Sequence, residues 1–315
     1  MKIREATHHD IPQILKVLKA SLGEISSKKT EEVWRYKHID NPFGESLVLV
    51  AEEEGEIAGV RAFMRWKWQK GNEIYSAFRA VDTATHPKHQ GKGIFKKLTL
   101  KALELGKERG DHFVFNTPNS QSLPGYLKMG WQKVGKIQVQ LIPTGFIHWK
   151  FKHDSFVYST EDRADAKELK TFMEKIQNKY IEDGRLFTPK TAEFLSWRYE
   201  NNPMQRYEVY KDSQVYMAGY KKKHKYFYEL RIVECLSASP TGLRMMQLQL
   251  KAWIKKFGVQ FVSFGKERCG NRNLKLSGNF GPVLTIRDIE LRDKPFSYLL
   301  DLDKWNYSLG DLELF

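Results

Sequence analysis

The sequence contains few cysteines, no long apolar run and no low-complexity tail, and each absence excludes a class of protein. Cys235 and Cys269 are its only cysteines, and they lack the close pairing of zinc ligands. We therefore expect neither a disulfide framework nor a metal site. No apolar stretch is long enough to cross a bilayer, and the N-terminal residues hold no apolar signal-peptide core. These features predict a soluble, cytoplasmic protein without membrane insertion.

Basic residues exceed acidic ones, which gives a formal net charge of +14 at pH 7. Nucleic acid is one partner that such a surplus attracts. The lysines, however, are scattered along expected helices and hairpins, as at Lys96-Lys97 and Lys255-Lys256. We therefore expect no nucleic-acid partner, and we interpret the charge as an attraction to small anionic ligands or as a solvated surface.

The most informative stretch is a polar strand end that leads through a basic, glycine-containing loop into an amphipathic helix. It contains, in order, Thr83, Ala84, Thr85, Lys88, Gln90, Gly91, Lys92, Gly93 and Ile94. Glycines let backbone N–H groups approach a ligand closely, and the start of a helix presents unpaired N–H groups at the positive end of its dipole. The stretch predicts a diphosphate site. The alternative is a tight strand-to-helix turn with solvated lysines.

A second segment lies one helix and one strand downstream, between Asn119 and Trp131. Together the two segments resemble the GNAT superfamily of acyl-CoA-dependent N-acyltransferases. The loop motif is matched by Gln90, Gly93 and position 95, and the downstream motif by Asn119, Ser122, Tyr126, Gly130 and Trp131. One departure is Phe95, where the family has Gly or Ala.

The pattern of elements predicts a mixed α/β sheet. Apolar alternation and turn residues indicate strands at 46–52, 57–67, 72–85, 112–116 and 131–141, with helices at 94–107 and 121–128. A second half follows the same order, with a helix at 241–257 and a strand at 260–264.

An internal repeat indicates that this half is a second copy of the same fold. The stretch from Lys29 to Tyr36 recurs from Lys190 to Tyr199, and each copy is followed by Asn-Pro. We expect two tandem GNAT-like domains, a catalytic one over residues 1–145 and a degenerate one over residues 154–315. In the second copy Pro240 leads directly into Thr241-Gly242, so the glycine loop has no counterpart, and Leu274 takes the place of Tyr126.

The resemblance implies an acetyl-CoA site. The loop from Gln90 through Gly91, Lys92 and Gly93 to Ile94 would hold the diphosphate, and Thr83, Ala84 and Thr85 would contact the pantetheine arm through their main chain. Asn119 would anchor the strand end or the cofactor. Alternatively, it is a plain turn residue.

Tyr126 is the candidate general acid, because a phenol near the sulfur can protonate the leaving thiolate. Its alternative role is packing. Asp82, just upstream of the loop, is the candidate general base, and its alternative role is that of an ion-paired strand residue. The carboxylate of Phe315 is a further possible base. Several aromatic residues lie where this family binds acceptors, and they suit an acceptor wall or the core equally well: Trp34, Tyr36, Trp66, Trp68 and Phe78.

These features predict an N-acetyltransferase that moves an acetyl group from acetyl-CoA to a primary amine of a small molecule. The expected acceptor is an amino sugar, a polyamine or an amino acid. One alternative is an aminoacyl transferase of cell-wall peptide synthesis, which the positive charge favours and the intact loop disfavours. Another is a non-catalytic acyl-CoA-binding protein.

Overall fold

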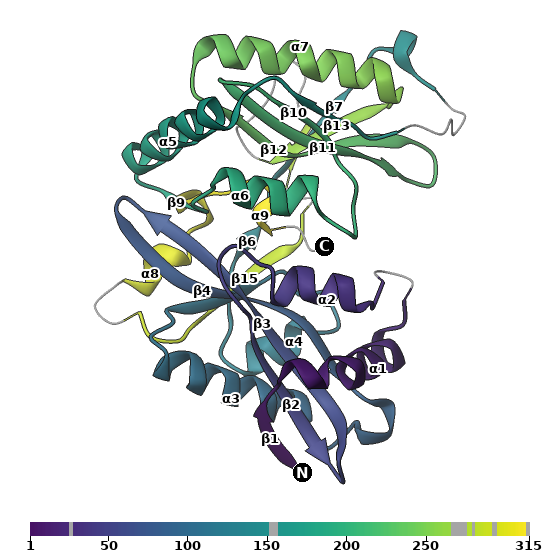
Figure 1. Cartoon of the computed structure of the whole chain (residues 1–315), viewed down its shortest axis with the longest axis vertical. Helices are drawn as coiled ribbons and strands as arrows, with labels where there is room; N and C mark the ends of the chain where they lie inside the picture. Colours follow the sequence, from purple (N-terminus) through teal and green to yellow (C-terminus); the bar gives the residue numbers. More distant parts are fainter. Residues whose placement is uncertain (25–27, 151–156, 266–275, 279–280, 292–294, 313–315) are drawn as a thin grey trace.

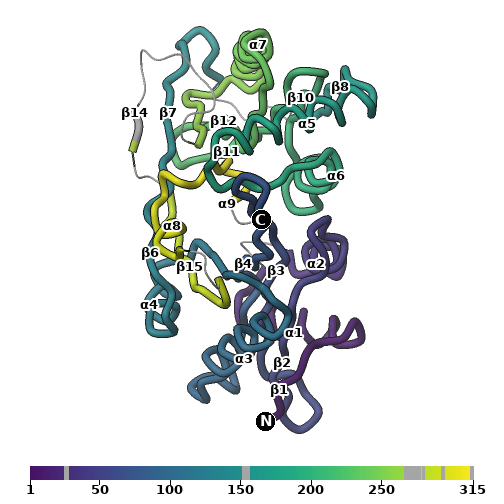
Figure 2. Tube along the Cα trace, turned by 90° about the vertical axis from the view of Figure 1, so that its left-hand side faces the viewer, coloured from purple at the N-terminus to yellow at the C-terminus, as the bar shows by residue number. Residues whose placement is uncertain are grey.

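Two lobes, each built around a mixed sheet, lie one above the other along the long axis of the molecule (Figure 1). The computed structural model describes residues 1–24, 28–150, 157–265, 276–278, 281–291 and 295–312. The C-terminal end of the described chain lies between the lobes in both views (Figures 1 and 2). The mixed α/β class expected from the sequence is confirmed.

The first sheet has the strand order β1-β2-β3-β4-β5-β15-β6 among the described residues, and β9 and β16 extend it beside β3. Its strands are β1 (Lys2–Glu5), β2 (Leu47–Glu53), β3 (Glu56–Lys70), β4 (Glu73–Thr85), β5 (Phe113–Asn116), β15 (Val283–Asp288), β6 (Gln132–Lys136), β9 (Leu186–Phe187) and β16 (Trp305–Asn306). β4 and β5 run parallel, whereas β1 to β4 are joined antiparallel.

The second sheet has the order β14-β7-β13-β12-β11-β10-β8. Its strands are β14 (Leu276–Gly278), β7 (Val139–Pro143), β13 (Phe261–Gly265), β12 (Tyr228–Ser237), β11 (Val215–Lys223), β10 (Glu208–Lys211) and β8 (Thr160–Asp162).

Helices cover both faces of the first sheet and pack on the second. They are α1 (Ile11–Leu22), α2 (Glu31–His38), α3 (Ile94–Glu108), α4 (Leu123–Lys128), α5 (Ala166–Asp183), α6 (Ala192–Leu195), α7 (Pro240–Phe257), α8 (Phe296–Leu299) and α9 (Leu309–Leu312). α1 and α2 pack on one face of the first sheet, and α3 and α4 on the other. The α1/α2 face joins a core that continues into the second lobe.

The two sheets exchange one strand each. β7, which follows β6 in the chain, pairs with β13 of the second sheet, while β15 inserts between β5 and β6 of the first. The exchanged segments cross at Ile137 and Gly281, whose backbones hydrogen-bond at 3.0 Å. A Cβ on Gly281 would lie 2.6 Å from the carbonyl oxygen of Ile137, so this crossing requires glycine. The strand expected at 131–141 is therefore broken at Ile137, and the expected division between residues 145 and 154 does not separate the two sheets.

The lobes meet through matching elements of the repeat. Thr30 and Thr191 each cap a helix by accepting a hydrogen bond from the backbone three residues later, and Asn41 and Asn202 stand 11 residues further on in each copy. In this register Tyr36 matches Trp197, and the two rings stack with centroids 5.0 Å apart. The Tyr36 hydroxyl donates to the carbonyl of Trp197, and the Trp197 indole donates to the carbonyl of Tyr36. Such reciprocal contacts support the proposal of a tandem fold related by an approximate two-fold axis.

Cys235 lies on β12 and is disulfide-bonded, a bond that our expectation of no disulfide framework did not anticipate. Leu274 lies outside the described residues, so its expected correspondence to Tyr126 stays a prediction.

Candidate active site

The candidate site lies where β4 and β5 separate. β5 pairs only with Ala77, Phe78 and Arg79 of β4, and it ends at Asn116. Over the next six residues, from Ala80 to Thr85, β4 is paired with β3 alone in the described chain. Its other edge therefore presents backbone N–H and C=O groups to a ligand, including those of Thr83, Ala84 and Thr85.

A β-bulge in this stretch determines which side chains face which helices. Arg61 pairs with Thr83 and Ala62 pairs with Val81, so Asp82 has no partner on β3. Asp82 also has φ +39°, an uncommon conformation for a residue other than glycine. Because the bulge shifts the alternation, Thr83 faces α3 and α4, whereas Asp82 faces α2.

The expected diphosphate loop follows β4 and contains two left-handed glycines. Gly91 has φ +79° and Gly93 has φ +71°, and a Cβ at either would meet nothing within 4 Å. Their requirement for glycine is therefore conformational. Gly93 is the N-cap of α3 and offers no side chain to it, so the N–H groups of Ile94 and the next two residues have no acceptor within the helix. Gln90 lies exposed at the loop's start.

Lys92 makes an ion pair at the protein surface. Its ammonium lies 2.8 Å from Glu53 of β2, and His89 lies 2.8 Å from the same carboxylate. An exposed pair of this kind is weak because solvent screens it, so Lys92 can exchange Glu53 for an anionic ligand at little cost.

The first turn of α3 lies close to the sheet because Gly59 has no side chain. A Cβ on Gly59 would lie 2.6 Å from Ile94, whose side chain is buried. Phe95, the departure from the family motif, turns instead toward α4, and its ring meets that of Tyr126 edge-on at 5.6 Å.

Asn119 builds the turn that starts α4. Its side-chain oxygen accepts hydrogen bonds from the backbone of Gln121 and Ser122 at 3.1 and 2.9 Å, and from the Ser122 hydroxyl at 2.9 Å. The plain turn role is thus observed, and any contact of Asn119 with the cofactor stays a prediction.

Tyr126 projects from α4 into the core beside β3 and β4, with 6% of its surface exposed. Its hydroxyl oxygen accepts a hydrogen bond from Arg61 at 2.8 Å, and the same Arg61 nitrogen contacts the Thr83 hydroxyl. Arg61 thus connects two of the expected site residues, although the sequence analysis did not identify it. The feature of the sequence that could have indicated it is the position of this arginine among the apolar residues of 57–64.

Asp82 lies on the opposite face of the sheet, in a cluster of basic groups. It pairs with Lys37, and it accepts a hydrogen bond from His38 at 2.9 Å. Burial opposes ionisation of Asp82, but the charge of Lys37 and the hydrogen bond from His38 outweigh it and hold the pKa of this carboxyl well below its usual range. These contacts favour the ion-paired role, because a strongly acidic carboxyl accepts a proton poorly at neutral pH. Its role as the base stays a prediction.

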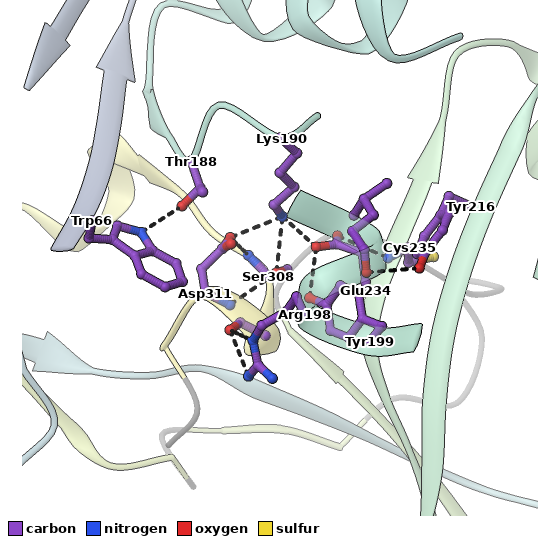
Figure 3. A network of polar contacts seen from close by, with 12 residues as sticks. Trp66, Thr188, Lys190, Arg198, Tyr199, Tyr216, Glu234, Cys235, Ser308 and Asp311 are labelled. Carbon is purple, nitrogen blue, oxygen red and sulfur yellow. Dashed lines mark hydrogen bonds and ion pairs between the residues drawn. The ribbon is translucent and has the colours of Figure 1, made fainter. Parts of the chain in front are cut away.

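The second lobe contains the counterpart of this cluster. Glu234 of β12 is fully buried and pairs with Lys190 at 2.5 Å, and Tyr199 donates to it at 3.1 Å (Figure 3). Lys190 and Tyr199 match Lys29 and His38 in the register of the repeat. In both lobes, therefore, a carboxylate on the central sheet holds the preceding helical segment.

Lys190 also ties the C-terminal end of the described chain to the second lobe. Its ammonium lies 3.1 Å from Asp311 and 3.1 Å from the Ser308 hydroxyl (Figure 3). From the first lobe, Arg79 of β4 donates to the carbonyls of Asp311 and Leu312. α9 is thus held by both lobes at the point where β4 and β5 separate. Phe315 lies outside the described residues.

A cavity of about 500 Å³ lies between the lobes beside α9. Its lining includes Thr117, which follows β5, Leu309 and Leu312 of α9, and Phe227 and Glu229 from the second lobe. Glu229 pairs with Arg231 at 2.9 Å. Burial opposes its ionisation, but Arg231, together with the hydrogen bonds from Ser263 and His224, outweighs burial and keeps the pKa of Glu229 below its usual range.

The aromatic residues singled out in the sequence are buried in the core and at the contact between the lobes. Trp66 and Trp68 have no exposed surface; Trp66 donates to Thr188, and Trp68 packs on Trp305 at 4.7 Å. Within the described ranges, no group of acidic, histidine or cysteine side chains could hold a metal ion. No described helix is long and apolar enough to span a bilayer.

Comparison with known proteins gives the same family for the first lobe. Residues 2–134 match the family model of the acetyltransferase (GNAT) domain. The L-amino acid N-acyltransferase MnaT of Escherichia coli (strain K12) is 29% identical over 108 residues, which cover 32% of this chain and 58% of that enzyme. The match thus spans less than two thirds of the curated relative.

Solved structures extend the likeness of fold to both lobes. A GCN5-related N-acetyltransferase from Anabaena variabilis ATCC 29413 superposes with a TM-score of 0.63 at 16% identity, covering 92% of this chain and 73% of that one. A GCN5-related N-acetyltransferase from Kribbella flavida gives a TM-score of 0.59 at 12% identity, covering 91% and 70%. Residues 2–134, with their separated β4 and β5 and their uncapped α3, therefore belong to the GNAT superfamily.

Proposed function

We propose that this chain is an N-acetyltransferase that transfers an acetyl group from acetyl-CoA directly to a primary amine of a small molecule. The observation that carries the proposal is the alignment of three features at one place. The open edge of β4, the uncapped N-terminus of α3 and the hydroxyl of Tyr126 adjoin one another. Together they fit a ligand with a diphosphate, an amide-containing arm and a thioester.

The residues present fit acetyl-CoA. Gly91, Lys92, Gly93 and Ile94 would bind the diphosphate, because backbone N–H groups at an uncapped helix start attract anions. Thr83 and Thr85 would hydrogen-bond the pantetheine arm as an added strand would. Acetyl-CoA supplies an acyl group activated as a thioester. Gln90, Ala84 and Asn119 would shape the path to it.

Tyr126 would serve as the general acid. Its hydroxyl lies beside Thr83, at the edge where the pantetheine arm would end. A phenol held there can give its proton to the leaving sulfur. Its buried ring is fixed by Phe95 and by Trp131, whose centroid is 5.1 Å away.

The cavity between the lobes would bind the acceptor. Thr117 places it at the end of β5, and Leu312, whose carbonyl accepts from Arg79, places it beside β4. Its apolar walls and its ionised Glu229–Arg231 pair suit a molecule that carries an amine, a carboxylate and an apolar group. Among the three acceptor classes expected from the sequence, an amino acid fits best, and MnaT is named for acylating L-amino acids.

The test is a panel of amino acids, amino sugars and polyamines with acetyl-CoA and the full chain, read by release of free thiol. We expect turnover that depends on the amine and is greatest with an apolar amino acid. Binding of acetyl-CoA without turnover on any amine would favour a non-catalytic binding protein. Transfer only from charged tRNA would favour the aminoacyl transferase.

A further inference from the structure

We propose that Arg61 is a positioning residue for the general acid, which holds the Tyr126 hydroxyl with its proton directed at the leaving sulfur and stabilises the phenolate that remains. This inference rests on the proposed function. It depends on Arg61, Phe63, Phe95, Thr83 and Tyr126, which all lie on the α3/α4 face of the first sheet.

Arg61 is a buried cation without a carboxylate partner among the described residues. Its exposed surface is 0%, and its Nε and Nη2 donate to no acceptor in the described chain. Burying an uncompensated charge costs free energy, and native proteins mostly pair such groups. Arg65, four residues further along β3, shows the ordinary solution, an ion pair with Asp111. The acceptors of Arg61 in the described chain are instead two hydroxyl oxygens, those of Thr83 and of Tyr126, the proposed acid, and this choice of partners points to a role in the reaction.

Aromatic rings surround this guanidinium in place of a carboxylate. Its Cζ lies 4.7 Å from the ring centroid of Phe63, 5.3 Å from that of Tyr126 and 5.6 Å from that of Phe95. Ring faces attract a cation without removing its charge. Phe95 is the residue that departs from the family motif, so the departure and the unpaired arginine occur together.

The direction of the hydrogen bond determines where the phenol's proton can go. A guanidinium has only donors, so in the 2.8 Å contact Arg61 must donate and the Tyr126 oxygen must accept. The Tyr126 O–H is then free to point away from Arg61, toward the edge of β4.

In the transfer step the amine nitrogen bonds to the thioester carbonyl carbon, and the C–S bond breaks with its electron pair on sulfur. Tyr126 gives its proton to that sulfur, and the resulting phenolate faces the Arg61 cation. The amine nitrogen releases one proton as the amide forms, and this proton, passed through solvent, restores the phenol. The step needs no further reactant.

The test is a double-mutant cycle with Arg61→Met and Tyr126→Phe, measured as kcat and as KM for acetyl-CoA. Arg61→Met alone should lower kcat about 10- to 100-fold with KM changed less than about 3-fold, because it removes stabilisation made only in the transition state. In the Tyr126→Phe background the same change should alter kcat less than about 3-fold, since the two residues act as one unit. Arg61→Lys, which keeps the charge, should lower kcat less than Arg61→Met does.

A stability measurement completes the test and needs no activity. The Tm of the combined Arg61→Met/Tyr126→Phe variant should equal or exceed that of the parent, because a buried unpaired charge has been removed. The control, Arg65→Met, should lower the Tm by leaving Asp111 unpaired, and it should leave kcat unchanged. An equal loss of kcat in both backgrounds, an unchanged kcat, or a marked fall in Tm of the combined variant would each overturn the inference. A parent that acetylates no amine would refute the proposed function and this inference with it, whereas an active parent with any of the three outcomes above would overturn the role of Arg61 alone.

Discussion

The first turns of α3 and α7 start the long helices of the two lobes, and they differ in how their backbone is satisfied. In α7 the Ser239 hydroxyl accepts a hydrogen bond from the N–H of Gly242 at 3.0 Å, and Pro240 removes another donor. A Cβ on Gly242 would lie 2.5 Å from Ser237, so this turn is packed against the sheet. In α3 the N-cap is Gly93, which has no side chain, and a loop with Gly91 separates the helix from β4.

The difference between these two helix starts indicates a different role for each lobe. A capped, tightly packed helix start stabilises a lobe, whereas an uncapped start leaves donors for a ligand. We infer that the first lobe binds acetyl-CoA and that the second supports the acceptor cavity and the C-terminal helix.

Because the two sheets exchange strands, neither lobe is complete without the other. Removing the second lobe should therefore have the largest effect on stability. A fragment of residues 1–150 lacks β15, the strand between β5 and β6. We expect this fragment to be insoluble or to unfold without cooperativity, because the exposed edges of β5 and β6 would be unpaired. The measurement is thermal unfolding followed by circular dichroism. A cooperative transition together with full acceptor turnover would show that the first lobe needs no second one.

The next effect concerns Tyr126, the proposed general acid of the first lobe. Tyr126→Phe keeps the ring but removes the proton donor, so kcat should fall about 100- to 10,000-fold. Acetyl-CoA affinity should change little, as measured by calorimetry. Tyr199→Phe is a matched control in the second lobe and should leave kcat within about 3-fold. A Tyr126→Phe variant with full kcat would remove Tyr126 from the mechanism.

Variants of Asp82 and of its counterpart Glu234 test whether Asp82 is a general base or a structural ion-pair partner. Asp82→Asn should destabilise the fold by about 3 kcal/mol, because it removes the carboxylate charge that faces the buried Lys37. Glu234→Gln should destabilise it less, because Lys190 keeps its ion pair with Asp311. Because the same contact recurs in the lobe without a ligand loop, we expect both variants to keep kcat within about 10-fold. Denaturant unfolding and steady-state kinetics measure the two quantities. A loss of more than about 100-fold in kcat for Asp82→Asn alone would identify Asp82 as the base.

The smallest effect is a pH dependence specific to the first lobe. Burial lowers the pKa of His38, and the hydrogen bond to Asp82 only partly offsets this. The unfolded chain then binds a proton at higher pH than the folded one, so stability is full above about pH 6.5 and falls as the pH drops below it. His38→Gln should flatten this decline. An unchanged slope of unfolding free energy between about pH 6.5 and 5 would show that His38 does not titrate with folding.

Much of the first lobe could be predicted from sequence because local chemistry determines it. Gly91 and Gly93 indicated the loop and Ile94 indicated the start of the helix, and the structure has both at these residues. These features depend on short-range patterns of glycines, caps and apolar spacing.

The features missed depend on contacts between residues distant in the chain. β7 and β15 have ordinary strand sequences, so nothing local indicated that they pair in exchanged sheets. Arg61 contacts Thr83 only because the bulge at Asp82 turns that residue toward it, so the proposed role of Arg61 could not be inferred from local sequence. The repeat was recognised, but nothing local indicated that Tyr36 of one copy stacks on Trp197 of the other.

The most direct test of the account is the number and place of acetyl-CoA sites, measured by titration calorimetry of the full chain. We predict one site per chain, abolished by Gly93→Val. The control Gly184→Val changes a glycine of the second lobe that has the same φ of +71° and equally open surroundings, so it should cost similar stability and leave binding unchanged. Two sites per chain, or unchanged affinity in Gly93→Val, would contradict the account.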